Sequence, residues 1–387
     1  MRKLFLSTIL SISFSPGFCD SLEERVAALE NSMQQIYLQT PNDTCGGRFS
    51  AGEFLDCCNC ESNCFAVAEI LYWHAKAGGT DWVLRQKNAG GLPIKGYTKD
   101  CSFTWDFGFR AGLGKGFEKD HWKISLIYTH FRTADTSKVH QNFTMPAGTA
   151  TVNPQSPGSR GTSQGKFSCL IHYDAIDLNL SRKFFYSPAL YLVPALGLKS
   201  SLIQVHEKLI AVNFINSLDT FFPVIGSVYT KIKDHCKFLG LGPEGSLDVN
   251  WLLGKGLLLT TNASAAVLYG ISNVEEKERT SLDDTSGDSQ TGRIKLESKT
   301  HRMMPWLRLF AGIGYETSWN REKYFLNLLL GYEVEYYWRM IQCFDAGYSI
   351  PSLTVAIPFD QSFRANIERG SEDVTFFGIT FKMNVRF

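Results

Sequence analysis

Three absences narrow the classes of protein to which this sequence can belong. After its N-terminus the sequence has no run of about 18 apolar residues, the length that a membrane-spanning helix needs. It also lacks G-x-S-x-G, H-E-x-x-H, P-loop and dinucleotide-binding glycine patterns. Its formal net charge is only +1, whereas a nucleic-acid-binding domain is usually clearly basic. We therefore expect neither a helical membrane protein nor a nucleic-acid binder, and we expect no enzyme, cofactor or metal site.

Residues 1–19 have the pattern of a secretory signal peptide. A basic start is followed by an apolar stretch over residues 4–14, and the small residues Gly17 and Cys19 stand before the expected cleavage point. A lipoprotein acylated on Cys19 is the alternative, but Phe18 is a poor residue immediately before an acylated cysteine. The pattern predicts an exported protein.

The last stretch of the chain predicts a membrane-crossing β-strand. From Phe377 to Phe387, apolar side chains alternate without a fault with polar residues or Gly, so one face of the strand is apolar and the other polar. Its length fits the roughly 9–11 residues with which a tilted strand crosses a bilayer. In an exported chain, a final strand that ends on Phe387 looks like the assembly signal of bacterial outer-membrane barrels. An edge strand of a soluble β-sandwich is the alternative.

The same alternation recurs along residues 65–387 and predicts an all-β fold, an antiparallel transmembrane β-barrel of about 12–16 strands. Short turns are expected at one end of the barrel and long loops at the other. The predicted short turns are residues 114–120, 253–256 and 319–323, and the predicted long loops are residues 133–166 and 271–301. Residues 203–238 stay open between bulged strands and a segment folded into the lumen.

Residues 20–40, ahead of the barrel, predict a short amphipathic or coiled-coil helix. Apolar residues recur at alternating steps of four and three, namely Leu22, Val26, Leu29, Met33 and Ile36. The repeat covers little more than two heptads, which is short for a coiled coil. Two interpretations stay open: a periplasmic helix for trimerisation or docking, and a helix packed on the barrel rim or in its lumen.

Residues 41–64 form a cysteine-rich linker. Its cysteines are Cys45, Cys57, Cys58, Cys60 and Cys64. A zinc site is one interpretation, but paired C-x2-C spacing is missing, and disulfides suit an exported chain better. Of the 10 cysteines in the sequence, 9 remain once Cys19 is removed, so at least one thiol has no partner within a monomer. That thiol is expected either to bond to another chain or envelope protein, or to stay free and buried.

Two motifs resemble the Legionella-type major outer-membrane protein family, which also occurs in chlamydia-like bacteria. One runs from Gly242-Pro-Glu-Gly-Ser-Leu-Asp-Val-Asn-Trp251 through a Gly-Lys-Gly turn to Asn262-Ala-Ser-Ala-Ala-Val-Leu-Tyr-Gly270. The other starts at Trp105-Asp-Phe-Gly-Phe-Arg-Ala-Gly-Leu-Gly114. Ser246 stands where the family has Gly, and Ser264 interrupts its alanines. The likeness covers roughly residues 65–387.

The resemblance implies a pore-forming barrel in the bacterial outer membrane, where its partners are membrane lipid, including lipopolysaccharide, and the barrel-assembly machinery. A chlamydial-type cell wall further implies rigidity from disulfides between surface proteins. The chain is also expected to form a homo-oligomer. These expectations come from the family and not from composition or spacing.

The charged residues of the predicted strands are expected to face a wet lumen, because unpaired polar groups facing lipid cost several kcal/mol. The pore-lining candidates are Asp106, Arg110, Lys123, Asp177, Asp248, Arg308, Glu316, Glu333, Glu335, Lys382 and Arg386. Their mixed signs favour a general pore for ions and small hydrophilic solutes, with weak ion preference. The same charges are alternatively interior salt bridges that brace a narrow, closed barrel.

Two other classes of function stay open. One is a structural or adhesive surface barrel without an open pore. The other is a barrel enzyme such as a lipase or protease, for which the only sequence support is that His121, His130 and His172 lie near Asp120 and Asp174. Sequence proximity on strands is weak evidence for a catalytic triad.

Overall fold

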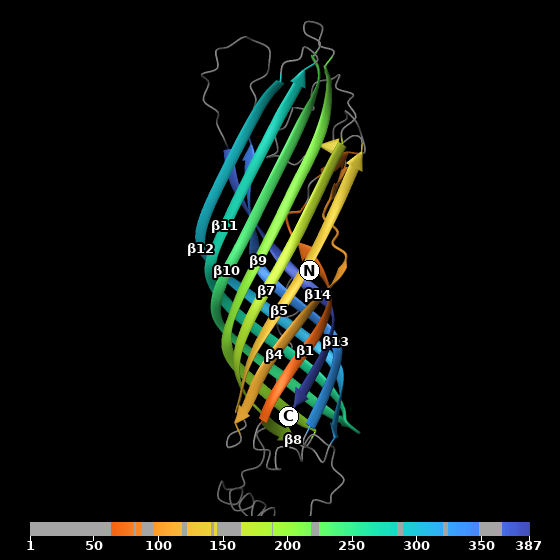
Figure 1. Cartoon of the computed structure of the whole chain (residues 1–387), viewed down its shortest axis with the longest axis vertical. Coiled ribbons are helices and arrows are strands. Elements are labelled where there is room, and N and C mark those ends of the chain that lie inside the picture. The colour runs from red at the N-terminus through yellow and green to blue at the C-terminus, as the bar shows by residue number, and fades with distance from the viewer. Residues whose placement is uncertain are drawn as a thin grey trace, which may run out of the picture. The chain divides into compact units, whose positions relative to one another are not determined.

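The computed structural model describes residues 63–80, 83–86, 96–117, 122–140, 143–144, 164–187, 189–217, 224–284, 289–319, 324–347 and 366–387. Within these ranges, ten strands close into one antiparallel β-barrel (Figure 1). The barrel strands, in their order around the wall, are β1 (Asn63–Ala77), β4 (Trp105–Phe117), β5 (Trp122–His140), β7 (Gln164–Arg182), β9 (Leu190–Ser217), β10 (Val224–Gly254), β11 (Leu257–Asp284), β12 (Ser289–Trp319), β13 (Tyr324–Gly347) and β14 (Asn366–Arg386).

Four short strands lie outside the ring. β2 (Val83–Gln86), β3 (Gly96–Lys99) and β6 (Phe143–Thr144) form a separate three-stranded sheet. β8 (Phe184–Ser187) pairs with the start of β9. No helix in the described part of the chain is long and apolar enough to cross a membrane. The predicted signal peptide and the predicted helix at residues 20–40 lie outside the described residues.

The last strand of the chain closes the barrel against the first. β14 pairs with β1 from Phe65 opposite Arg386 to Ala77 opposite Val374. Beyond this ladder, the backbone N–H of Phe387 donates a hydrogen bond to the carbonyl oxygen of Cys64, at 3.0 Å. Closure removes the open edge of the sheet and pairs its backbone groups, which the interior of a bilayer requires. The sequence-based prediction of a closing C-terminal strand is thus confirmed.

Ten strands is fewer than the predicted range of about 12–16, and the reason is strand length. β10 and β12 each have 31 residues, about three times what a bilayer needs. Of residues 203–238, left open above, 203–217 belong to β9 and 224–238 to β10, and most of the loop predicted at residues 271–301 belongs to β11 and β12. These segments lose the apolar alternation because they extend past the membrane, where neither face must be apolar.

The two faces of the wall differ as the alternation predicts. Large apolar side chains point outward, and several are mostly exposed, such as Phe107 at 73%, Leu196 at 75% and Ile313 at 60%. Their neighbours in sequence point into the barrel and are mostly buried. On β14, Ile379, Phe381 and Met383 face outward while Thr380 faces inward and is buried.

The predicted turn between β10 and β11 is confirmed and depends on glycine. Gly254, Lys255 and Gly256 have φ values of 97°, 54° and 82°, in the left-handed region that favours glycine. At Gly256 a Cβ atom would also lie 2.6 Å from the carbonyl oxygen of Glu316. We call the end of the barrel with this turn and Phe387 the turn end, and the opposite end the loop end.

Exchange of an outward residue for Arg should destabilise the barrel far more than the same exchange on the inner face. Leu309 points outward from the middle of β12 and is 48% exposed, so Leu309→Arg should cost about 2–4 kcal/mol of unfolding free energy in a bilayer. Asn327→Arg is the control. Asn327 lies on the inner face beside Glu316, so the new positive charge would lie in a polar site. Reversible unfolding in lipid vesicles measures both values, and equal losses would contradict the assigned faces.

Candidate functional site

Arg110 is the centre of a buried charge network inside the barrel. From β4 its Nη1 lies 2.5 Å from Glu69 Oε2 on β1, and its Nη2 lies 3.1 Å from Glu333 Oε1 and 2.9 Å from Glu335 Oε1 on β13. Its Nε donates to Thr129 Oγ1 on β5 at 2.9 Å. One guanidinium therefore joins four strands through charge-assisted hydrogen bonds, the stronger kind.

Two further cations balance the three carboxylates. Lys382 Nζ lies 3.0 Å from Glu69 Oε1, and Arg308 Nε lies 3.9 Å from Glu333 Oε1. The remaining carboxylate oxygens are also bound: Glu333 Oε2 accepts a hydrogen bond from Thr380 at 2.7 Å. Buried charges persist only when they are paired and hydrogen-bonded in this way.

A second ion pair lies beside this network. Lys199 Nζ is 2.8 Å from Asp177 Oδ1 and sits 3.9 Å above the ring centroid of Trp306. The Lys199 side chain is fully buried, so the carboxylate and the ring face replace water around the ammonium group. Glu244, also buried, is an exception, because neither of its carboxylate oxygens has a hydrogen-bond partner among the described residues.

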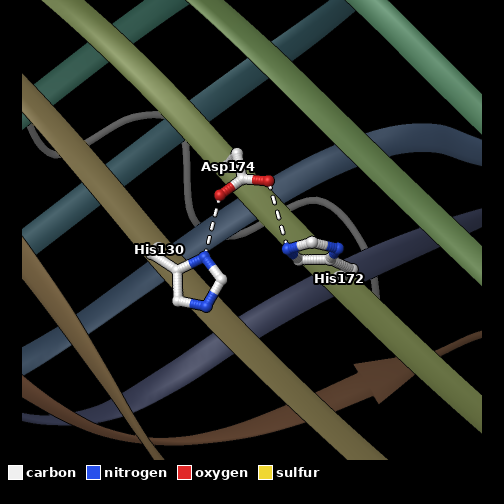
Figure 2. Close-up of side chains that lie close together, drawn as sticks. All are labelled: His130, His172 and Asp174. Atoms are coloured by element: carbon white, nitrogen blue, oxygen red, sulfur yellow. Dashed lines mark hydrogen bonds and ion pairs between the residues drawn. The ribbon is translucent and has the colours of Figure 1, made fainter.

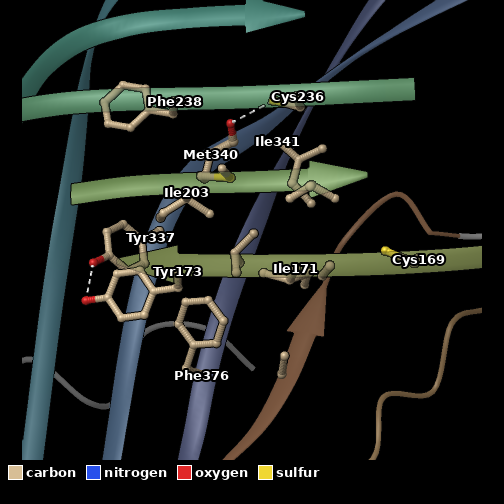
Figure 3. Close-up of a cluster of buried hydrophobic side chains, with 14 of the residues drawn as sticks. Cys169, Ile171, Tyr173, Ile203, Cys236, Phe238, Tyr337, Met340, Ile341 and Phe376 are labelled. Carbon is tan, nitrogen blue, oxygen red and sulfur yellow. Dashed lines mark hydrogen bonds between the residues drawn. The ribbon is translucent and has the colours of Figure 1, made fainter. Parts of the chain in front are cut away.

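An aromatic cluster fills the barrel on the loop-end side of the Arg110 network. Figure 3 shows part of it, with Tyr173, Tyr337 and Phe376 close together. Tyr173 stacks on Phe376 with ring centroids 5.0 Å apart, and Trp73 packs against both Phe131 and Phe376. The Tyr337 hydroxyl donates to the Tyr173 hydroxyl at 2.8 Å, and Tyr173 donates to Glu335 Oε2 at 2.8 Å. The apolar cluster and the charge network are therefore one connected unit.

This section of the barrel is filled rather than open. Arg110 is 4% exposed, and Glu335, Trp73, Tyr173 and Phe376 are 0% exposed. Inward side chains around a water-filled channel would keep contact with solvent. Among the described residues, side chains from opposite walls meet here and exclude water.

A cavity of about 210 Å³ remains between the network and the turn end. Five of the predicted pore-lining residues are among those around it: Lys123, Asp248, Glu316, Lys382 and Arg386. Lys382 thus contributes both to the cavity wall and to the pairing of Glu69. The cavity is polar and charged, and the filled section closes it on the loop-end side.

All eleven predicted pore-lining residues face the interior, but they form groups with different surroundings. Arg110, Asp177, Arg308, Glu333 and Glu335 belong to the filled section. Asp106 lies closer to the loop end and accepts a hydrogen bond from Thr133 at 2.5 Å. The other five line the cavity.

Sequence reasoning missed several members of the network. Glu69 and Lys199 fall in stretches that look apolar overall, and Tyr173 and Tyr337 alternate with outward residues as ordinary wall positions do. A usable signal exists for Glu69, which is the only carboxylate between Phe65 and Ala77. A lone carboxylate on the inner face of an apolar strand indicates a partner across the barrel.

Two of the histidines noted in the sequence meet Asp174 on the outer face of the wall (Figure 2). His130 Nδ1 lies 2.8 Å from Asp174 Oδ1, and His172 Nε2 lies 3.2 Å from Asp174 Oδ2. Tyr128 donates a further hydrogen bond to this carboxylate at 2.6 Å. The ligand atoms lie within 4.8 Å of one another, so these three residues could hold a metal ion. Serine, threonine and cysteine nucleophiles are not among the contacts that the structure gives this group.

Of the five predicted disulfide cysteines, only Cys64 is a described residue, and its thiol is free. Cys101, Cys169 and Cys236 are also free. Cys236 and Cys169 are buried inside the barrel, which matches the alternative of a buried free thiol for these two positions. The other four members of the cysteine-rich linker lie outside the described residues.

Removal of the guanidinium at the centre of the network should destabilise the barrel strongly. Arg110→Met leaves Glu69, Glu333 and Glu335 close together without their shared cation, which should cost about 3–5 kcal/mol. Lys115→Met is the control, because Lys115 is exposed on the same strand and loses the same charge. Urea unfolding of both variants tests this, and an Arg110 variant as stable as the control would show that the network contributes little.

Comparison with known proteins identifies a family. The sequence model described as "Legionella pneumophila major outer membrane protein precursor" matches residues 58–387. The comparison with curated proteins gave no match.

Three solved structures that resemble the chain are distant in sequence. The outer membrane protease OmpT from Escherichia coli is 12% identical, with 84% of this chain and 97% of that chain covered and a TM-score of 0.41. The Pseudomonas putida toluene transporter TodX is 6% identical, with 84% and 90% covered and a TM-score of 0.24. A Pseudomonas aeruginosa FadL homologue is 8% identical, with 84% and 90% covered and a TM-score of 0.24. Similarities as weak as these do not indicate the activity of this chain.

The family match covers most of the chain and includes every strand of the barrel. The outward apolar belt and the closed ladder agree with a location in a bilayer. The protein therefore belongs to the Legionella pneumophila major outer membrane protein family and is a β-barrel of the bacterial outer membrane.

Proposed function

We propose that this barrel is a structural component of the outer membrane whose interior is closed in its resting state. One observation carries the proposal: the Arg110 network and the aromatic cluster fill the barrel, with Arg110 4% exposed and Tyr173 0% exposed. The number of strands agrees with this. Barrels of about 8 strands are just wide enough for side chains to fill, whereas barrels of about 16–18 strands leave an aqueous channel.

The pairing inside the barrel makes the closed state stable. Opening a path would separate Arg110 from carboxylates on two other strands and would expose the stacked rings of Tyr173 and Phe376. The Tyr337–Tyr173–Glu335 hydrogen bonds couple these two events. A simple side-chain rotation would not open the interior, because each member is held by at least one other strand.

The cysteine-rich linker supports a structural role. Cys64 lies at the turn end, which in bacterial barrels is the periplasmic end. The linker therefore joins the barrel on the side where envelope proteins and other copies of this chain are accessible. Export makes its thiols oxidisable. In this function the linker cross-links the barrel to its neighbours. Phe387, at the end of the closing strand, is the signal that the assembly machinery recognises.

A second candidate is a pore for passive diffusion of ions and small hydrophilic solutes. The resemblance of the two sequence motifs to this family supports it, as does the charged cavity at the turn end. In this function, ions would pass only after the Arg110 network rearranges. Lys382 would then influence ion preference, because it lies at the junction of cavity and network.

Conductance across planar bilayers separates the two candidates. The purified, refolded barrel should give no steady single-channel steps in salt solution, because its filled section excludes water. A known general porin in the same bilayers is the positive control. Regular steps from the wild-type barrel, with an ion preference that changes in Lys382→Glu, would contradict the closed barrel and establish the pore.

Cross-linking through the linker has its own test. In native envelopes with thiols blocked at lysis, we expect high-mass species that disappear on reduction, because adjacent Cys57 and Cys58 cannot easily both bond to one neighbour. Changing these two residues to Ser should remove part of these species, while Cys236→Ser should not, since Cys236 is buried in the barrel. Only monomer on non-reducing gels would contradict the cross-linking role.

A further inference from the structure

The outer face of β9, β10, β11 and β12 carries a dense basic surface beyond the apolar belt, toward the loop end. Its main members are Lys208, Lys233, Lys277, Lys295, Arg279 and Arg293, all of them exposed. We call these six residues the basic surface. The whole chain has a net charge of only +1, so this concentration does not follow from composition.

Strand register places the four lysines in one row. Lys233 on β10 is directly opposite Lys208 on β9 and Lys277 on β11, and Lys277 is directly opposite Lys295 on β12. In the next row, Arg279 is directly opposite Arg293. Neighbouring strands are about 4.7–4.9 Å apart, and like charges directly opposite each other on one face are destabilising.

Among the described residues, acidic side chains compensate one half of this row. Glu275 contacts Lys277 and lies 3.7 Å from Lys295 Nζ, and Glu297 contacts Lys295. The ion pairs of the described residues include Lys277 and Lys295 but give Lys208 and Lys233 no acidic partner. The row therefore retains uncompensated positive charge, and an external anion would remove the repulsion.

Apart from Glu275 and Glu297, the charges beside the lysine row are sorted by face. Along β11, Lys277 and Arg279 point outward, whereas Glu276 and Glu278 point inward and are buried. On β10, Lys233 points outward and its neighbour Asp234 lines a small interior cavity. In this region the outer face of the barrel therefore carries mainly basic side chains, and these face the surroundings of the barrel.

The distance of the basic surface from the edge of the apolar belt indicates which part of the membrane surrounds it. On β10 the outward apolar residues Leu241 and Leu239 mark the edge of the apolar belt, and Lys233 lies six positions farther along the strand. With about 3.4 Å per residue and a tilt near 45°, the lysine row lies on the order of 14 Å beyond that edge. That is farther out than the headgroup layer of simple phospholipids, about 5–8 Å per leaflet. It lies within the reach of a lipid whose headgroup is an extended, phosphorylated sugar chain.

We propose that the basic surface binds the phosphate groups of a phosphorylated glycolipid in the outer leaflet, with Lys208 and Lys233 making the contacts that no acidic residue in the described part of the chain supplies. Binding neutralises the lysine row and fixes the barrel in the glycolipid layer on one wall. The site depends only on the location of the barrel in the outer membrane, and it operates whether the interior is closed or conducting.

Binding of fluorescent lipopolysaccharide to the purified full chain in a neutral detergent tests the site. The double variant Lys208→Gln/Lys233→Gln should bind on the order of 30-fold more weakly, because each lysine near an anionic lipid surface contributes about 1 kcal/mol. Lys76→Gln/Lys115→Gln is the matched control, because it removes the same charge from outward positions on β1 and β4 across the barrel, and it should bind like wild type. Unchanged heat-modifiable mobility on gels shows that both variants are folded.

Two further probes define the ligand. Enzymatically dephosphorylated lipopolysaccharide should bind weakly, and phosphatidylglycerol micelles should compete poorly. Inorganic phosphate at the same phosphate concentration should not compete, since it cannot span a row of lysines. Equal binding of the double variant and wild type, or of dephosphorylated and intact lipopolysaccharide, overturns the proposal. Equal competition by phosphatidylglycerol overturns the assignment to an extended glycolipid.

Discussion

Arg110 reaches from β4 to carboxylates on β1 and β13 and to a hydroxyl on β5, and the rest of the barrel must keep these groups within hydrogen-bonding distance. A buried cation surrounded by three carboxylates is tolerated only while every partner is in place. A slip of one residue between any of these strands would move one partner to the lipid face. The network therefore selects a single register for the strands around the closing ladder, in a fold whose backbone pairing alone would allow several.

The wall of the barrel could be predicted from the sequence, and its dimensions could not. Alternation around Phe107, Leu309 and Ile379 identifies the lipid-facing side correctly. Polar groups that face the bilayer interior are energetically unfavourable, so apolar residues occupy that face wherever the strand crosses the membrane. Strand length lies beyond that signal. Past the membrane, as in residues 271–284, both faces of a strand can carry polar residues. A β-strand and a polar loop therefore have similar sequences there.

The interior shows a second limit of sequence reasoning. Inward orientation of Arg110 and Glu333 follows from the alternation, but pairing between β4 and β13 depends on how far the barrel curves. The curvature depends on the number of strands, and the sequence-based prediction gave too many strands. With more strands the same residues would line a wet channel, and with ten they meet. The distinction between a pore and a brace is thus a question of barrel diameter and not of residue type.

The meeting of Cys64 and Phe387 at the turn end has a mechanical consequence. A tether attached through the cysteine-rich linker would pull on β1 along its own axis, at the point where the Phe387 N–H binds the Cys64 carbonyl. The hydrogen bonds from β1 to β14 and β4 lie across that axis, so many of them would share the force at once instead of opening one after another. An envelope stretched by turgor would thus load this barrel in shear, the direction in which a β-sheet yields least.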